Sequence, residues 1–150
     1  LMSNYRSAFV RLAMSYANGK NDLKASADVL DRMEQIIPRA KYPMGWELES
    51  DLAMFYHRVG RMDKFNELGD DVEAACEALI AQGKATVNSY YNPYRVLLDL
   101  YETRKDYRKE HDLLTNLNQL YPNTPELIQR LAAVDKSLGA DSTARADSVH

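Results

Sequence analysis

The sequence is poor in the features that mark several large classes of protein. Its 150 residues include one cysteine, Cys76, so an internal disulfide is excluded. No apolar run approaches the roughly 20 residues that a membrane-spanning helix needs. The formal net charge is −3, and no cluster of Lys and Arg forms the basic stripe that nucleic acid requires. We therefore expect a soluble globular domain without a nucleic-acid partner.

Residue patterns typical of catalysis and metal binding are also missing. The histidines are His57, His111 and His150, and none has a second histidine, cysteine or carboxylate at a metal-ligand spacing. The sequence contains no glycine-rich phosphate loop and no Gly-x-Ser-x-Gly motif. Because consecutive residues of a helix point in different directions, we interpret Glu110, His111 and Asp112 as a solvated face. We expect no metal, no cofactor and no catalysis within this chain.

What the sequence does contain is helical periodicity, which is clearest between residues 94 and 122. Apolar side chains at Tyr94, Leu97, Leu98 and Tyr101 form one stripe at 3.6 residues per turn. A polar break follows, and then a second stripe made of Tyr107, Leu113, Leu114, Leu117, Leu120 and Tyr121, which Pro122 ends. Two short amphipathic helices joined by a tight turn predict an αα-hairpin.

This stretch resembles a tetratricopeptide (TPR) repeat, whose pattern is large-x2-Leu-small-x2-Tyr followed by a proline. Tyr94, Leu97, Tyr101 and Pro122 occupy these positions, and Leu98 stands where the family prefers a small residue. A second match comprises Phe9, Leu12, Ala13, Tyr16 and Pro38, and a degenerate third comprises Leu52, Ala53 and Tyr56. The resemblance spans most of the chain, and it concerns packing residues, so it predicts a fold.

The resemblance implies a right-handed solenoid of about three helical hairpins in one all-α domain, residues 1–139. The hairpins are expected at residues 4–38, 45–83 and 92–122, followed by a capping helix at residues 125–138. Asp22 and Asn92 are predicted helix caps, Pro93 a first helical residue and Gly139 a helix end. Residues 140–150 are small and polar without periodicity, so we predict a disordered tail.

The same resemblance implies a concave groove that takes a peptide or a segment of a partner protein. Its expected positions are Arg11, Met14, Asp51, Met54, His57, Arg58, Asn92, Arg95, Asp99 and Glu102. An equal alternative is that these residues are the solvated sides of amphipathic helices. They lack the Lys, Asn and Arg pattern of carboxylate-clamp TPR domains, so we do not expect capture of a chaperone C-terminus. The sequence thus predicts a non-catalytic interaction scaffold and leaves its partner unnamed.

A narrower resemblance concerns residues 4–13, NYRSAFVRLA, together with residues 27–38. These segments are similar to the C-terminal soluble region of glycosyltransferase-like multi-pass membrane proteins of Bacteroidetes. The implied alternative is an accessory or regulatory domain, attached to the bacterial inner membrane through segments that precede it. A third hypothesis is a small helical enzyme, which requires His57, Arg58, Asp99 and Glu102 to converge on one pocket.

Overall fold

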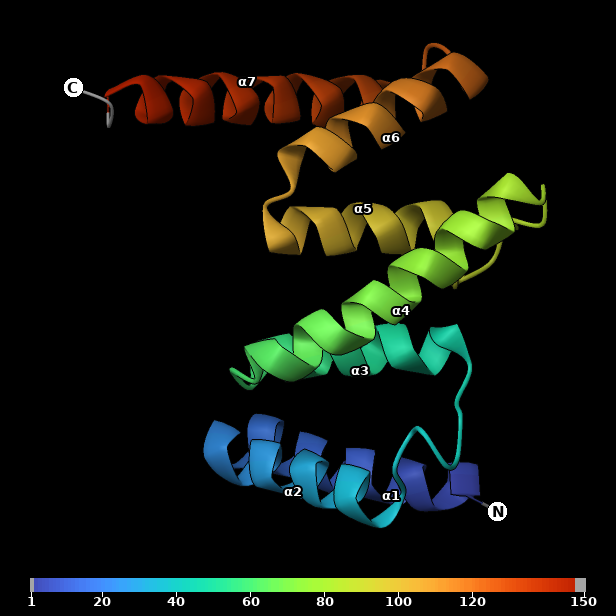
Figure 1. Ribbon diagram of the computed structural model, residues 1–150, viewed down its shortest axis with the longest axis vertical. Helices are drawn as coiled ribbons and strands as arrows, with labels where there is room; N and C mark the ends of the chain where they lie inside the picture. Colours follow the sequence, from blue (N-terminus) through green and yellow to red (C-terminus); the bar gives the residue numbers. More distant parts are fainter. Residues whose placement is uncertain (1, 148–150) are drawn as a thin grey trace. The chain divides into compact units, whose positions relative to one another are not determined.

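The computed structural model describes residues 2–147, and within them the secondary structure is helices joined by turns and connectors, without strands (Figure 1). Its helices are α1 (Met2–Met14), α2 (Leu23–Ile36), α3 (Trp46–Arg58), α4 (Met62–Ala81), α5 (Pro93–Arg104), α6 (Tyr107–Leu120) and α7 (Pro125–Asp147), with a π-helical turn, η1 (Ser15–Gly19), after α1. The prediction of an all-α fold is confirmed. Within residues 2–147, none of the helices combines the length and the apolar character needed to cross a membrane.

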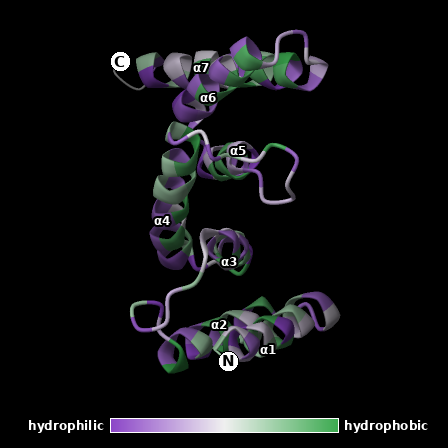
Figure 2. Cartoon of the chain, turned by 90° about the vertical axis from the view of Figure 1, so that its right-hand side faces the viewer, coloured by the Kyte–Doolittle hydropathy of each residue, from purple (hydrophilic) through white to green (hydrophobic). Residues whose placement is uncertain are grey.

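Contacts divide the chain into two units, which we call the N-terminal unit (residues 1–75) and the C-terminal unit (residues 76–150). The boundary falls within α4. In both units the helices are amphipathic, and Figure 2 shows hydrophobic and hydrophilic residues alternating around them. Each unit therefore buries its own set of apolar side chains.

The core of the N-terminal unit is made by the apolar sides of α1, α2, α3 and the first part of α4. The buried set includes Ala13, Ala17, Leu30, Met33, Leu52, Ala53, Tyr56 and Val72. Two buried hydrogen bonds join neighbouring helices. Ser26 donates to the carbonyl of Ala13 at 2.8 Å, and the Tyr56 hydroxyl donates to the carbonyl of Leu30 at 3.3 Å. These bonds satisfy polar groups that would otherwise be buried without a partner.

The buried face of α1 differs from the predicted one. Leu12, expected among the packing residues, is exposed, and so is Tyr5. Ala13 is buried as the motif predicts, and the charged Arg6 is buried with it. Arg6 and Ala13 are seven residues apart and so lie on one face of α1, which is the face that the structure buries. The buried guanidinium of Arg6 donates to the carbonyls of Ile37, at 3.2 Å, and of Tyr42. These carbonyls supply the hydrogen bonds that allow a cation to replace an apolar side chain.

Side chains and prolines begin several helices as the sequence predicts. Asp22 accepts a hydrogen bond from the backbone N–H of Ala25 at 2.9 Å, and so caps α2. Asn92 accepts one from the N–H of Tyr94 at 3.0 Å, and Pro93 is the first residue of α5. The predicted caps are confirmed. The first helix of the predicted hairpin changes after Met14 into η1.

The C-terminal unit is built around a cluster of buried side chains from α5, α6 and α7. Leu98, Leu114, Leu117 and Val134 form this cluster, and Tyr94, Tyr107, Leu113, Leu127, Leu131 and Leu138 pack against it. Leu97 and Tyr101, the TPR-motif residues of α5, are also buried. Leu120 and Tyr121 were predicted to lie in the buried stripe of α6 but are exposed. Leu120 is the last residue of α6, and the helical projection no longer applies to Tyr121, which follows it.

The last helix is longer than predicted. α7 does not end at Gly139 but continues to Asp147, so the predicted disordered tail is wrong for residues 140–147. Two hydroxyl groups bond to carbonyls one turn back, from Ser142 to Leu138 at 2.9 Å and from Thr143 to Gly139 at 2.9 Å. The alanines of this segment favour the helical state. The segment has little hydrophobic periodicity, so the sequence pattern did not predict a helix there. The prediction for residues 148–150 lies outside the described residues.

Candidate functional site

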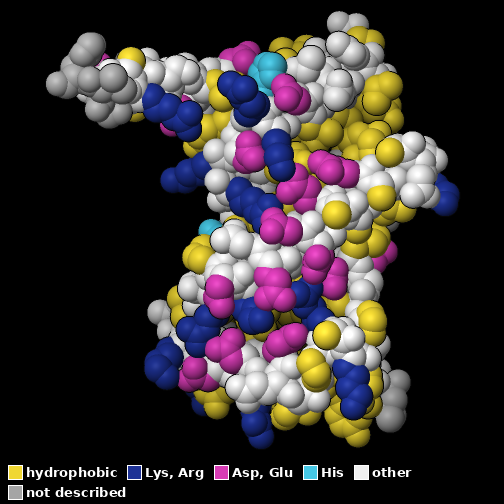
Figure 3. All heavy atoms as spheres, viewed as in Figure 1, with side chains coloured by type: hydrophobic (Ala, Val, Ile, Leu, Met, Phe, Trp, Pro, Cys, Tyr) yellow, Lys and Arg dark blue, Asp and Glu magenta, His cyan; other side chains and the backbone are white. Residues whose placement is uncertain are grey.

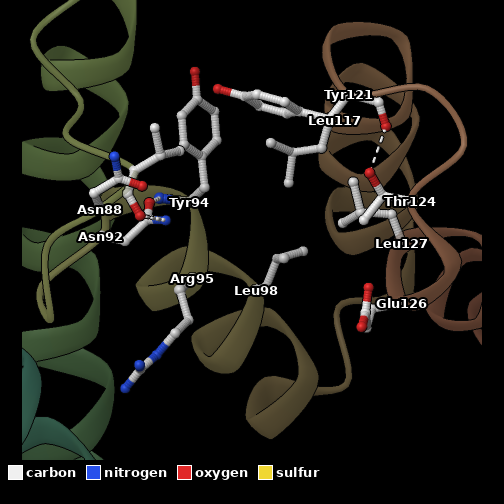
Figure 4. A pocket seen from close by; sticks show the side chains of 11 residues that line it. Asn88, Asn92, Tyr94, Arg95, Leu98, Leu117, Tyr121, Thr124, Glu126 and Leu127 are labelled. Carbon is white, nitrogen blue, oxygen red and sulfur yellow. Dashed lines mark hydrogen bonds between the residues drawn. The ribbon is translucent and has the colours of Figure 1, made fainter.

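A pocket of about 410 Å³ lies in the C-terminal unit, where α5 begins, α6 ends and α7 begins. The residues that line it are Val87, Asn88, Asn92, Tyr94, Arg95, Leu98, Leu117, Tyr121, Thr124, Glu126 and Leu127. Leu98, Leu117 and Leu127 belong to the core cluster or pack against it, so the floor of the pocket is apolar. Figure 4 shows Arg95 on the α5 side and Glu126 on the α7 side.

The α5 side of the pocket is fixed by Asn92. Its Nδ2 donates to the carbonyl of Val87 at 3.1 Å, while its Oδ1 accepts from the N–H of Tyr94. One side chain therefore holds the preceding connector against the first turn of α5. The sequence identified Asn92 as a cap, but the bond to Val87 was not predictable from helix-start signals.

The opposite side is fixed by the turn between α6 and α7. The N–H of Tyr121 bonds to the carbonyl of Leu117 at 2.8 Å, and Asn123 takes a left-handed conformation with a φ of 63°. The hydroxyl of Thr124 then donates to the carbonyl of Tyr121 at 2.9 Å, the bond drawn in Figure 4. This turn reverses the chain within a few residues and leaves Tyr121 and Glu126 beside the pocket.

The chemistry of the lining suits an apolar side chain accompanied by polar groups. Binding sites for small ligands commonly have volumes of about 300 to 1,000 Å³ and combine apolar walls with a few polar groups. The hydroxyl groups of Tyr94 and Tyr121 point toward one another across one end of the pocket (Figure 4). Phenol hydroxyls both donate and accept, so they can bond to the peptide groups of a bound segment.

A charged cluster joins the three helices that form the pocket. The guanidinium of Arg130, on α7, lies 2.9 Å from a carboxylate oxygen of Glu102, 3.9 Å from one of Asp99 and 3.0 Å from one of Glu110. We call these four residues the Arg130 cluster. Asp99 and Glu102 were predicted site residues on α5, and the structure shows them bound to a cation that the sequence did not identify.

Glu110 corrects a prediction. Its side chain was expected in a solvated face, but the residue is only 2% exposed. Burial raises the pKa of the Glu110 carboxyl, and its hydrogen bond to Arg130 opposes that effect. Burial also raises the pKa of Asp99, against the attraction of Arg130. No sequence signal pairs Glu110 with a residue twenty positions later, because their contact depends on how α6 and α7 pack.

The predicted groove residues of the N-terminal unit lie mostly on its surface. Arg11, Met14, Asp51, Met54 and Arg58 are exposed, and His57 is half-buried. The His57 ring packs edge-on against Phe65, with ring centroids 4.9 Å apart, and Arg58 donates to the side-chain oxygen of Asn18 at 2.6 Å. His57 and Arg58 belong to the N-terminal unit, and Asp99 and Glu102 to the C-terminal unit.

A second charged cluster that the sequence did not reveal stabilises the N-terminal unit. Arg39, in the connector after α2, lies 2.5 Å from Glu67 and 2.8 Å from Asp71, both on α4. It also lies 3.6 Å from Glu49 on α3 and 4.0 Å from Glu34 on α2. Within residues 2–147, no three His, Cys, Asp or Glu side chains form a group suited to a metal ion.

Comparison with known proteins yields one partial similarity. The chain is 28% identical over 127 residues to RhlB, an ATP-dependent RNA helicase of Photorhabdus laumondii. The alignment covers 77% of this chain but 29% of the helicase, so the chain spans less than a third of the helicase's length. No protein-family model matches the chain, and no solved structure matches it. This similarity does not place the chain in a family.

Proposed function

We propose that this chain is a non-catalytic, TPR-like interaction module, which binds a partner protein by taking one of its apolar side chains into the pocket of the C-terminal unit. The observation that carries the proposal is the apolar floor of Leu98, Leu117 and Leu127 beneath an opening flanked by polar side chains. Complete burial of a Leu or Phe side chain in such a pocket contributes about 1.5 to 3 kcal/mol.

The TPR-like part of the proposal rests on where the motif residues lie. In α5, Leu97, Leu98 and Tyr101 are all buried, as the repeat requires of its packing positions. Leu52 and Tyr56 occupy the corresponding positions in α3 and are buried as well. Burial at these spacings supports two helical repeats whose first helices share a common packing pattern.

The surface around the pocket supports a protein partner. Figure 3 shows hydrophobic side chains gathered beside the turn between α6 and α7. Exposed apolar patches on helical domains mark interaction sites. The activity in the helicase's name fits this surface poorly, because phosphates are bound by clustered cations. Among the described residues that line the pocket, Arg95 is the one basic side chain.

The resemblance to membrane-bound glycosyltransferase-like proteins suggests a second context for the binding role, in which the chain is part of a larger membrane protein. In that setting the module is an accessory domain that binds a neighbouring protein near the membrane. The resemblance of residues 4–13 and 27–38 is the observation that favours it. Predicted membrane spans upstream in the complete gene product would support this setting, and their absence would remove it.

Selection from a displayed library of random peptides tests the binding role directly. We expect selected peptides to share one large apolar residue and to lose binding when Asn88→Trp fills the pocket. Asn4→Trp, at another exposed asparagine in the N-terminal unit, is the matched control and should leave binding unchanged. Peptides that bind the Asn88→Trp variant as well as the native chain would refute the proposed site.

A further inference from the structure

The connector before α5 and the segment from the end of α6 to the start of α7, which both contribute to the pocket, carry large apolar side chains that remain open to solvent. They are Val87, Tyr90, Leu120, Tyr121 and Ile128, and Tyr90 is 70% exposed. Their exposure carries a cost unless another surface covers them, and contiguous patches of this kind are typical of protein interfaces.

The patch has two halves that carry charges of opposite sign. The first half is the connector and the start of α5, with the projecting ring of Tyr90 and the cation of Arg95. The second half is the turn and the start of α7, with the pocket wall at Tyr121 and the anion of Glu126. A projecting ring and a cation thus lie in one half and an anion in the other, and residues of both halves line the pocket between them.

A two-fold axis lying in the interface between these halves would bring each half of one copy against the opposite half of another. In such an isologous dimer each contact between two residues occurs twice, so each favourable residue pair contributes twice to the binding free energy. We infer that the partner which fits this pocket is a second copy of the chain. The ring of Tyr90 from each copy enters the pocket of the other, and Arg95 faces Glu126 of the other copy.

The projecting half is already ordered for such a contact. The Arg95 guanidinium lies over the Tyr90 ring at 5.2 Å, and Tyr90 packs edge-on against Tyr91 with ring centroids 5.0 Å apart. The Arg95 side chain also lies 3.8 Å from a carboxylate oxygen of Asp99 and keeps 56% of its surface exposed. Ordering before contact reduces the entropy lost on association, which favours a rigid aromatic anchor.

Sedimentation velocity over a concentration series tests this inference on the full chain. We expect the native chain, with a mass of 17.1 kDa, to sediment as a dimer at high concentration and as a monomer on dilution. Arg95→Glu and Glu126→Arg, each tested alone, place like charges opposite one another twice. Each should raise the dissociation constant by at least about tenfold, because like-charge contacts cost several kcal/mol.

An equimolar mixture of the two variants is the decisive sample. In a mixed dimer both charge pairs are again opposite in sign, so the mixture should associate although neither variant does so alone. Lys24→Glu, which reverses an exposed cation of the N-terminal unit, is the matched control and should dimerise like the native chain. Circular dichroism confirms that each variant is folded.

The inference rests on the proposed function, because both use the same pocket, and the two fail in different ways. A native chain that stays monomeric at every concentration overturns the inference, as does a mixture that fails to associate. If displayed peptides still bind and Asn88→Trp still blocks them, a different protein occupies the pocket and the proposed function stands. Both proposals fail if no selected peptide depends on the pocket and the native chain also stays monomeric.

Discussion

Replacing Arg130 with leucine should destabilise the C-terminal unit, and the loss should depend on pH. The guanidinium of Arg130 is the cation that faces Glu102, Asp99 and Glu110 in the Arg130 cluster. The substitution keeps an aliphatic side chain on α7 but leaves the carboxylate of Glu110 buried without its cation. The cost therefore comes mainly from an uncompensated negative charge.

The magnitude follows from how deeply each partner is buried. Removing one partner of a fully buried ion pair costs about 3 to 5 kcal/mol. The Glu110 side chain is 2% exposed, but that of Arg130 is 30% exposed, so water screens part of the interaction. We expect a loss of about 2 kcal/mol in the free energy of unfolding at pH 7. Glu110→Gln removes the buried charge itself and should cost less than about 1 kcal/mol.

The sign of the pH dependence follows from the direction of the pKa shift. Burial raises the folded-state pKa of Glu110 above its unfolded value. A carboxyl with a raised pKa contributes most stability below its unfolded pKa, and that contribution is lost as pH rises through its folded pKa. Without Arg130 the folded pKa rises further. The penalty of Arg130→Leu should therefore be largest at neutral pH and shrink toward pH 4, where Glu110 becomes protonated.

Urea unfolding of the full chain at pH 7 and near pH 4.5, followed by far-UV circular dichroism, measures the effect. Adding Glu110→Gln to Arg130→Leu should recover about half of the loss or more, because the buried charge is then absent. A penalty below about 0.5 kcal/mol at pH 7, the size expected of a surface substitution, would refute the reasoning. So would a penalty that is the same at both pH values.

Two pairs of substitutions and one single substitution test the packing, the backbone conformation and the second charged cluster by thermal or urea unfolding. Tyr101→Ala removes a ring that is 4% exposed and should cost about 3 kcal/mol, whereas Tyr5→Ala, at a tyrosine 55% exposed, should stay within about 0.5 kcal/mol; equal losses would contradict the packing. Gly139→Ala should stabilise α7 by about 0.5 to 1 kcal/mol, because an added Cβ meets nothing within 4 Å. The same change at Gly83, where φ is +65°, should destabilise by about 1 kcal/mol, and a gain there would be inconsistent with the left-handed conformation. Arg39→Met should cost about 1 to 2 kcal/mol at low salt, and less at high salt, because it leaves several carboxylates without their cation; a loss that does not depend on salt would argue against an electrostatic role.

The sequence predicted the helices of this fold well because the residues that start each helix, and the stripe that it buries, lie within or next to that helix. Asp22 and Asn92 cap helices with their own side chains, and Pro93 begins one through its fixed φ. The stripe of Leu97, Leu98 and Tyr101 reports a buried face through a spacing of 3.6 residues. None of these signals needs knowledge of a neighbouring helix.

Predictions failed where the outcome depended on a neighbour or on a change of helical geometry. Arg6 is buried although it is charged, because the carbonyls of Ile37 and Tyr42 accept hydrogen bonds from its guanidinium. Tyr121 carries the apolar character of the α6 stripe, but the helix ends one residue before it. The helical part of residues 140–147 lacks a hydrophobic stripe, so no periodicity could identify it.

The candidate site illustrates the same limit more sharply. Asn92 and Arg95 were predicted from the frame of α5 alone, and both line the pocket. Glu126 is an acid in the first turn of α7, where it favours the helix, and only its position opposite Arg95 gives it a second role. A pocket formed by three helix ends has no periodic signature, because its residues share a location and not a spacing. Helix-end residues that serve as capping or turn signals therefore deserve testing as binding residues wherever several helix ends meet.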